Sequence, residues 1–171
     1  DALQADDKDA IRRAIWDAKP YRPDGIVDGK NLMSLVTEPT KTCDHEYPFE
    51  GLNEKLHGIR YGELTTLTAG SGSGKTSRVR AIAADLAMKG ETVGILELEA
   101  NNKRTALGLM SAAVGKPYHS GEHDKEELES AFADTLAKRN VFLMDGFGSF
   151  DPDVIYNRIE YLASGLECRI I

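Results

Sequence analysis

Apolar residues along this chain follow two periods, and from residue 64 onward the two periods alternate. Short apolar runs with the length of buried strands lie at 64–68, 92–98, 141–144 and 168–171. Between them, apolar residues repeat every three or four positions, as on one helix face, over 76–89, 103–114, 125–139 and 151–163. Because parallel strands are joined by helical crossovers, the pattern predicts an α/β fold with a parallel sheet covered on both faces.

Local signals place the ends of the predicted helices. Gly90 is a stop for the helix at 76–89, and Gly115 and Pro117 end the next one. The sequence Asp151-Pro152-Asp153 supplies a cap, a proline suited to the first turn and a first-turn carboxylate. The residues of the helix at 76–89 expected to face the sheet are Val79, Ile82, Ala83, Leu86 and Ala87.

The first 48 residues have a different pattern. An apolar stripe over 7–18 predicts a short amphipathic helix, which ends before Lys19-Pro20. The stretch 21–48 is rich in Pro, Gly, Asp and Thr, and we interpret it as a tether with one short helical turn around 32–36. We therefore expect a linker helix and tether over 1–48 and an α/β domain over 49–171. The linker helix packs either on that domain or on a neighbouring subunit.

The segment between the run 64–68 and the helix that follows carries the strongest chemical signal. It reads Ala69-Gly70-Ser71-Gly72-Ser73-Gly74-Lys75-Thr76 and is called the glycine loop below. Strand, glycine-rich loop and helix is the context of a phosphate-binding P-loop (Walker A motif), although Ala69 stands where the usual pattern has glycine. Backbone N–H groups and the positive end of the helix would face a polyphosphate. In such a loop Lys75 reaches the β- and γ-phosphates and Thr76 ligates Mg²⁺; the alternative is a plain glycine turn.

Nucleotide hydrolysis also needs a group that positions water, and Glu99 is our candidate. It directly follows the predicted strand 92–98, and catalytic groups of open α/β sheets lie at the carboxyl ends of strands. The alternative is a solvated loop residue. Glu97 shares a strand face with Glu99, so it is either an interior carboxylate or lies where the strand already bends.

Three more polar residues follow predicted strands. Asn101 and Asn102 either contact the γ-phosphate and its water or cap the next helix. Asp145 either joins the site or is a turn residue before Gly146. No apolar strand ending in the aspartate of a Walker-B site is found, so the Mg²⁺ site within this sequence is expected to be incomplete.

Composition excludes some classes of protein. The 171 residues correspond to about one domain, and no apolar run reaches the roughly 20 residues of a membrane span. The net charge of −7 argues against an autonomous nucleic-acid binder, and Cys43 and Cys168 are expected to be free thiols. The four histidines show no zinc-ligand spacing. The chain starts with Asp1 and ends within a predicted strand, so we expect it to be a fragment of a longer protein.

Taken together, these motifs resemble the DnaB-like replicative ring helicases, which have a RecA-like core. The segments that carry the resemblance are 49–56 (FEGLNEKL), 58–64 (GIRYGEL), the glycine loop, and 93–99 (VGILELE), which ends in Glu99. The closest resemblance is to the phage primase–helicases and their mitochondrial relative Twinkle, whose loops also tolerate a first residue other than glycine. The stretch 18–27 resembles their linker, and 161–168 resembles the segment before their Walker-B strand.

The resemblance implies a RecA-like P-loop NTPase that uses ATP or another NTP with Mg²⁺. Lys75 and Thr76 would hold phosphate and metal, and Glu99 would activate the attacking water. It also implies a homo-oligomer, a hexameric ring whose linker helix docks on the neighbouring subunit. The ring would translocate on single-stranded DNA at the replication fork through parts beyond this sequence. The expected location is the cytoplasm, that of the host if the protein is phage-encoded, with no membrane partner.

Other functions remain open at the level of sequence. A RecA-type recombinase, or another RecA-fold ATPase, would handle DNA without unwinding it. A small P-loop kinase would need an acceptor pocket and an arginine-rich lid, and neither is visible in the sequence. A module that only binds nucleotide or assembles with partners is the fourth reading.

Overall fold

The computed structural model describes residues 28–39 and 42–171, so the predicted helix at 7–18 and the linker-like stretch 18–27 lie outside the described residues. The chain divides into two units, Asp1–Lys41 and Thr42–Ile171. The described part of the first unit holds a 3₁₀ turn, η1 (Gly29–Asn31), and a short helix, α2 (Met33–Thr37). The Asp28 carboxylate accepts a hydrogen bond from the Lys30 amide and caps η1. The helical turn predicted around 32–36 is therefore confirmed.

The second unit begins with a loop that the sequence pattern did not predict to be structured. A helix, α3 (Glu50–Leu56), lies inside it, and the loop is closed by an antiparallel bridge between His45 and Ile59. Asn53 fixes the turn, because its side chain accepts from the Tyr47 amide at 2.8 Å and donates to the Tyr47 carbonyl at 2.9 Å. Gly58 has φ of +86°, and a Cβ there would lie 2.4 Å from Cys43 Cβ, so only glycine fits.

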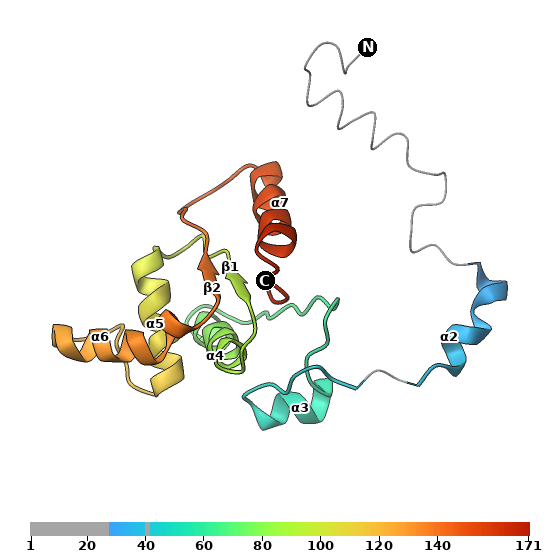
Figure 1. Ribbon diagram of the computed structural model, residues 1–171, viewed down its shortest axis with the longest axis horizontal. Coiled ribbons are helices and arrows are strands. Elements are labelled where there is room, and N and C mark those ends of the chain that lie inside the picture. Colours follow the sequence, from blue (N-terminus) through green and yellow to red (C-terminus); the bar gives the residue numbers. More distant parts are fainter. Residues whose placement is uncertain (1–27, 40–41) are drawn as a thin grey trace, which may run out of the picture. The chain divides into compact units, whose positions relative to one another are not determined.

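Helices and strands alternate in the rest of the unit, which is compatible with the predicted α/β fold (Figure 1). The elements, in chain order, are α4 (Lys75–Met88), β1 (Val93–Ile95), α5 (Asn102–Val114), α6 (Lys125–Asp134), η2 (Leu136–Lys138), β2 (Val141–Leu143), α7 (Pro152–Glu160) and the π-helical turn η3 (Tyr161–Gly165). Asn101 caps α5, and Asp151 caps α7 with Pro152 in its first turn, as predicted.

The sheet has two parallel strands, with Val93 beside Val141 and Ile95 beside Leu143. Ile170 forms a parallel bridge to Val93 on its other side. Val93 belongs to the core cluster of α4 and α5, whereas a Cβ on Gly94 would lie 3.0 Å from Leu162 in η3. Because neighbouring strand residues point to opposite faces, α4 and α5 cover one face of β1 and η3 covers the other.

The core of this unit lies between α4, α5 and β1. Leu86, Leu109, Val93 and Thr105 are its largest side chains below 2% exposure. Ala83 and Ala87 are also buried and Ile82 packs against them, as predicted for the inner face of α4. Val79 is 51% exposed, so its predicted burial is wrong. The helix predicted over 125–139 breaks at Thr135, whose backbone leaves the helical region (φ −109°, ψ −86°) between α6 and η2.

The strand predictions need larger corrections. The run 64–68 is not a strand: the structure shows no strand pairing there, and Leu64 is 93% exposed. A strand depends on a partner for its backbone hydrogen bonds, and within the described residues this run has none. The strand predicted over 92–98 ends at Ile95, and 168–171 contributes only the bridge at Ile170. Among the described residues, no helix combines the length and apolar character needed to cross a lipid bilayer.

Candidate phosphate-binding site

The glycine loop is an open, exposed turn that leads into α4. Residues 69–74 are all exposed, and Gly72 and Gly74 have φ of +72° and +85°. Gly74 is the N-terminal cap of α4 and provides no side-chain hydrogen bond to the helix. Because the first four N–H groups of a helix lack intrahelical acceptors, the start of α4 presents free donors and a partial positive charge. This is the local geometry that binds anions at helix N-termini.

Lys75 adds a full positive charge at the same place. Its ammonium donates to the carbonyl oxygens of Ala69 at 2.7 Å and Gly70 at 2.9 Å, so it lies over the entrance of the loop. The Ser73 hydroxyl also donates to the Gly70 carbonyl, at 2.7 Å, which closes the turn. Within the described part of the chain Lys75 forms no ion pair, and its hydrogen-bond acceptors are neutral carbonyl oxygens. These residues fit a polyphosphate, whose oxygens are stronger acceptors for an ammonium.

Two further side chains lie in the first turn of α4. Arg78 donates to the Ser73 carbonyl at 2.7 Å and brings a second cation to the loop. Thr76 is exposed, at the second position of the helix, where its hydroxyl faces no core residue. A Cβ added to Gly70 or Gly72 would meet no atom within 4 Å, so the space around the loop is open.

The predicted carboxylates follow the two strands at one edge of the sheet. Glu99 is exposed four residues after the end of β1, and Asp145 is exposed two residues after the end of β2. The two connections are tied together, since the Gly148 amide donates to the Leu98 carbonyl at 2.9 Å. Asp145 accepts from the Asn102 side chain at 3.3 Å. The structure thus brings the regions of Glu99 and Asp145 together, as parallel strands require.

The structure does not join these carboxylates to the glycine loop. In the described part of the chain, no hydrogen bond or ion pair links Glu99 to residues 69–76. The described residues also contain no group of three His, Cys, Asp or Glu side chains that would hold a metal ion. Asn101 accepts from the Arg104 amide at 2.9 Å, so of its two readings the structure supports the helix cap. The roles of Lys75, Thr76 and Glu99 stay predictions.

Sequence reasoning missed one charged cluster beside this site. Glu97 forms a partly buried ion pair with Arg80 of α4 and accepts a hydrogen bond from Thr105 of α5. The expectation that Glu97 is an interior carboxylate is therefore met, although β1 has already ended at Ile95. The signal in the sequence was Arg80 itself, which interrupts the apolar inner face of the helix predicted over 76–89. An acidic residue, Glu97, stands in the strand predicted next along the chain.

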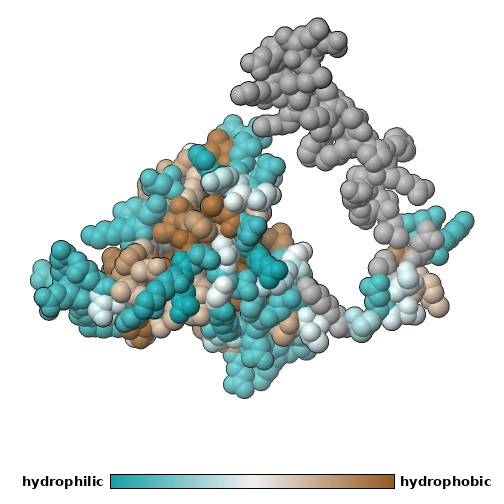
Figure 2. Space-filling view, in the orientation of Figure 1, coloured by the Kyte–Doolittle hydropathy of each residue, from teal (hydrophilic) through white to brown (hydrophobic). Residues whose placement is uncertain are grey.

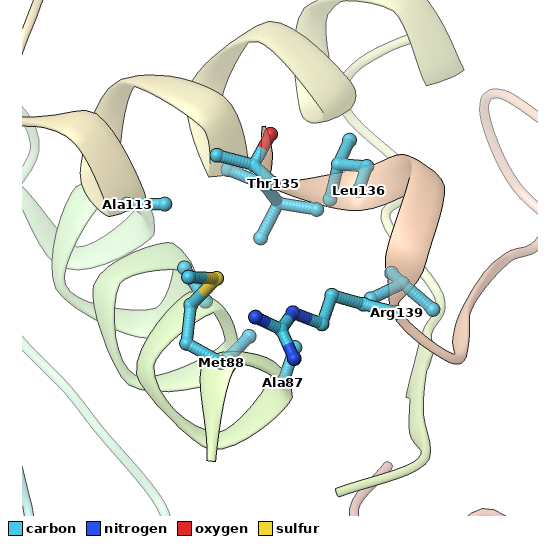
Figure 3. Close-up of a pocket in the computed structure, with 10 residues that line it drawn as sticks. Ala87, Met88, Ala113, Thr135, Leu136 and Arg139 are labelled. Atoms are coloured by element: carbon cyan, nitrogen blue, oxygen red, sulfur yellow. The ribbon is translucent and has the colours of Figure 1, made fainter. Parts of the chain in front are cut away.

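One pocket in the described residues lies away from this loop (Figure 3). Its lining is mostly apolar, with Ala87 and Met88 of α4, Ala113 of α5 and Leu136 of η2. The Arg139 guanidinium extends toward Ala87 and Met88 (Figure 3). Met88 is the last residue of α4 and lies roughly 20 Å along the helix from Lys75, at 1.5 Å per residue. The pocket therefore lies at the C-terminal end of α4 and does not belong to the glycine loop.

Comparison with known proteins shows a similarity to a phage replication protein. The chain matches no protein-family model. It is 29% identical over 180 residues to the DNA helicase/primase of Enterobacteria phage T3, an alignment that covers 99% of this chain and 32% of that protein. The chain thus spans about a third of the length of its relative. Because the similarity runs through the glycine loop and both strands, it supports a relationship between this chain and the phage primase–helicases.

Proposed function

We propose that the protein is an NTP-dependent replicative DNA helicase and that this chain supplies part of its motor. The observation that carries the proposal is an exposed glycine loop with Lys75 at its entrance, in a chain similar over 99% of its length to a phage helicase/primase. The fold proposed for the motor is the RecA-like P-loop NTPase. The proposed ligand is ATP or another NTP with Mg²⁺, which supplies the phosphoanhydride bond whose hydrolysis drives movement.

The residues of this chain have separate tasks in that proposal. The amides at the start of α4 and the Lys75 ammonium bind and orient the phosphates, and the Thr76 hydroxyl is positioned to ligate the metal. Lys75 would exchange two neutral carbonyl acceptors for phosphate oxygens. Glu99, exposed and without an ion pair among the described residues, is free to accept a hydrogen bond from water and hold it for attack. Asp145 is a second carboxylate at the same edge of the sheet.

The wider assembly is part of the proposal. We infer a homo-oligomeric ring, a hexamer, that translocates on single-stranded DNA and separates the duplex at a replication fork. The linker helix of residues 7–18 would dock on the neighbouring subunit. A RecA-fold ATPase that handles DNA without unwinding it is the competing outcome of the test.

Nucleotide turnover and strand separation test the proposal in the full-length protein. Lys75→Ala should abolish NTP hydrolysis, and Glu99→Gln should keep nucleotide binding but lose turnover, because the amide cannot act as a base. A forked duplex with a labelled strand distinguishes the two DNA functions. Release of the strand supports a helicase, whereas DNA-stimulated hydrolysis without release supports the competing ATPase. Full turnover by the Glu99→Gln protein would move the water-positioning role to another residue.

A further inference from the structure

A partly buried ion pair connects the helix of the glycine loop to the segment that carries Glu99. Arg80 of α4 holds Glu97 with two nitrogens: Nη2 lies 2.6 Å from Oε1 and Nε lies 3.3 Å from Oε2. The two side chains are only 13% and 17% exposed. Such fork-shaped pairs fix direction as well as distance, because both guanidinium donors must meet both carboxylate oxygens.

A third element holds the same carboxylate. The Thr105 hydroxyl of α5 donates to Glu97 Oε2 at 2.7 Å, and Thr105 is among the most buried residues of the chain. Gly108, one turn later on α5, makes room for the arginine, since a Cβ there would lie 2.8 Å from Arg80 Cδ. Glu97 therefore ties α4, α5 and the β1–α5 connection at a single point.

The position of this cluster relates it to the candidate site. Arg80 lies five residues after Lys75 on α4, and Glu97 lies two residues before Glu99. The Leu98 carbonyl between them accepts the Gly148 amide at 2.9 Å. The Glu99 side chain is exposed, so its location depends on how the backbone on either side is held.

A purely stabilising purpose explains this cluster poorly. Burying a guanidinium and a carboxylate has a large desolvation cost, and apolar side chains of similar volume often stabilise a protein as well or better. What the ion pair provides, and apolar packing does not, is a fixed geometry between charged groups. The connection that benefits is the one that leads to Glu99.

We propose that Arg80, Glu97 and Thr105 form a positioning device that sets the Glu99 carboxylate relative to the glycine loop. The inference rests on the proposed function, since it assigns these residues to the same hydrolysis reaction. None of the three touches nucleotide; each acts through the backbone of 96–101.

The first test replaces the ion pair by apolar side chains in the full-length protein, as Arg80→Leu with Glu97→Met. The fold should persist, because the volume is retained and no charge is left unpaired. The rate constant kcat should fall, by about a hundredfold if Glu99 moves by about 1 Å, while the KM for nucleotide stays unchanged. Lys89→Met is the matched control, since it removes the Asp85–Lys89 pair from the far end of α4 and should leave kcat unchanged.

The second test separates geometry from stability at Thr105. Thr105→Ser keeps the hydroxyl that reaches Glu97, and Thr105→Val keeps the shape without it. The Thr105→Ser protein should retain the wild-type kcat although it loses a buried methyl group. The Thr105→Val protein should have a lower kcat. Three outcomes would overturn the positioning role. The double apolar variant could keep the wild-type kcat, or its KM could rise in parallel with the fall in kcat. In the two Thr105 variants, kcat could simply follow the melting temperature. A wild-type protein without turnover would instead refute the proposed function. Full turnover by the Glu99→Gln protein would move the water-positioning role to another residue and would also overturn the positioning role of Glu97.

Discussion

At the scale of single residues, the backbone of the glycine loop depends on where its glycines have positive φ. Gly74 caps α4 with φ of +85°, a region that costs an L-residue roughly 1–2 kcal/mol. Gly70 is in the same loop without a positive φ, and a Cβ there would meet no atom within 4 Å. The two glycines therefore differ in conformation although both are exposed.

This difference gives a matched pair of substitutions. Gly74→Ala should lower the free energy of unfolding by about 1 kcal/mol and weaken nucleotide binding, because relief of the strain would turn the first amides of α4 away from the loop. Gly70→Ala should change the free energy of unfolding by less than about 0.5 kcal/mol. Chemical denaturation and titration with a fluorescent nucleotide measure both effects. Equal losses in the two proteins would show that the positive φ at Gly74 is unimportant.

A second residue-scale feature is the Tyr61 hydroxyl, which donates to Glu91 Oε1 at 2.7 Å. Burial, followed by the hydrogen bond to Glu91, raises the pKa of Tyr61 above its usual value, against an opposing effect from Arg169. His45 also contacts Glu91, at 2.9 Å, and the backbone amide of Tyr61 donates to Asp44. The cluster holds the segment before the glycine loop against the α4–β1 turn.

The raised pKa of Tyr61 predicts a loss of stability in alkali. A folded-state pKa above the unfolded value means that its contribution is complete below the unfolded pKa of about 10 and is lost as pH rises through the folded pKa. Tyr61→Phe should make the free energy of unfolding less dependent on pH between about 9 and 12. Tyr156→Phe, at a position 69% exposed, is the control and should keep the wild-type slope. Burial also raises the pKa of Cys168, which is present in both proteins and so cancels in the comparison.

At the scale of elements, the sequence predicted helices better than strands for a physical reason. Helix ends depend on neighbouring residues, and the Asn101, Asp151 and Gly115 signals all lie where the structure uses them. Strands depend on distant partners, which a local pattern does not contain. The run 64–68 has the composition of a strand and no partner among the described residues, and β1 is shorter than its apolar run.

In the candidate site, too, local features were predictable from the sequence and contacts between distant residues were not. The start of α4 directly after the glycine loop is a local feature, and the structure places it as expected. The strand predicted before the loop is absent from the described residues. The Arg80–Glu97 pair joins residues 17 positions apart on different elements, so no local pattern shows it. Charges at core-facing positions of a predicted helix and strand are the one trace such a pair leaves in a sequence.

The cap of α5 gives a prediction at this scale. Asn101 Oδ1 accepts the Arg104 amide at 2.9 Å, whereas the adjacent Asn102 makes only a long, exposed bond to Asp145. Asn101→Ala should lower the free energy of unfolding by about 1 kcal/mol, the usual value of an N-terminal cap. Asn102→Ala should change it by less than about 0.5 kcal/mol. A larger loss at Asn102 than at Asn101, measured by urea unfolding, would contradict this assignment of the cap.

At the scale of the whole unit, a small sheet leaves much apolar surface uncovered. The two strands and the bridge at Ile170 are all the strand pairing described in 93–171. Figure 2 shows apolar residues at the surface over this sheet. The most exposed large hydrophobic residues of the second unit include Leu64, Phe147, Tyr156 and Tyr161. Surfaces of this kind usually contact other protein.

The separation of the glycine loop from the carboxylates leads to the last prediction, on the isolated 171-residue chain. It should bind nucleotide weakly through the glycine loop but hydrolyse it at a rate close to the uncatalysed reaction. The reason is geometric: in the described residues no hydrogen bond or ion pair joins Glu99 to the loop, and no cluster of three acidic or metal-binding side chains is present to complete a metal site. Phosphate release by the purified chain, with Lys75→Ala as the blank, measures this directly. Robust turnover that disappears in the Lys75→Ala chain would mean that Glu99 reaches the phosphates without any further contact, and the positioning role of Glu97 would then be testable in the chain alone.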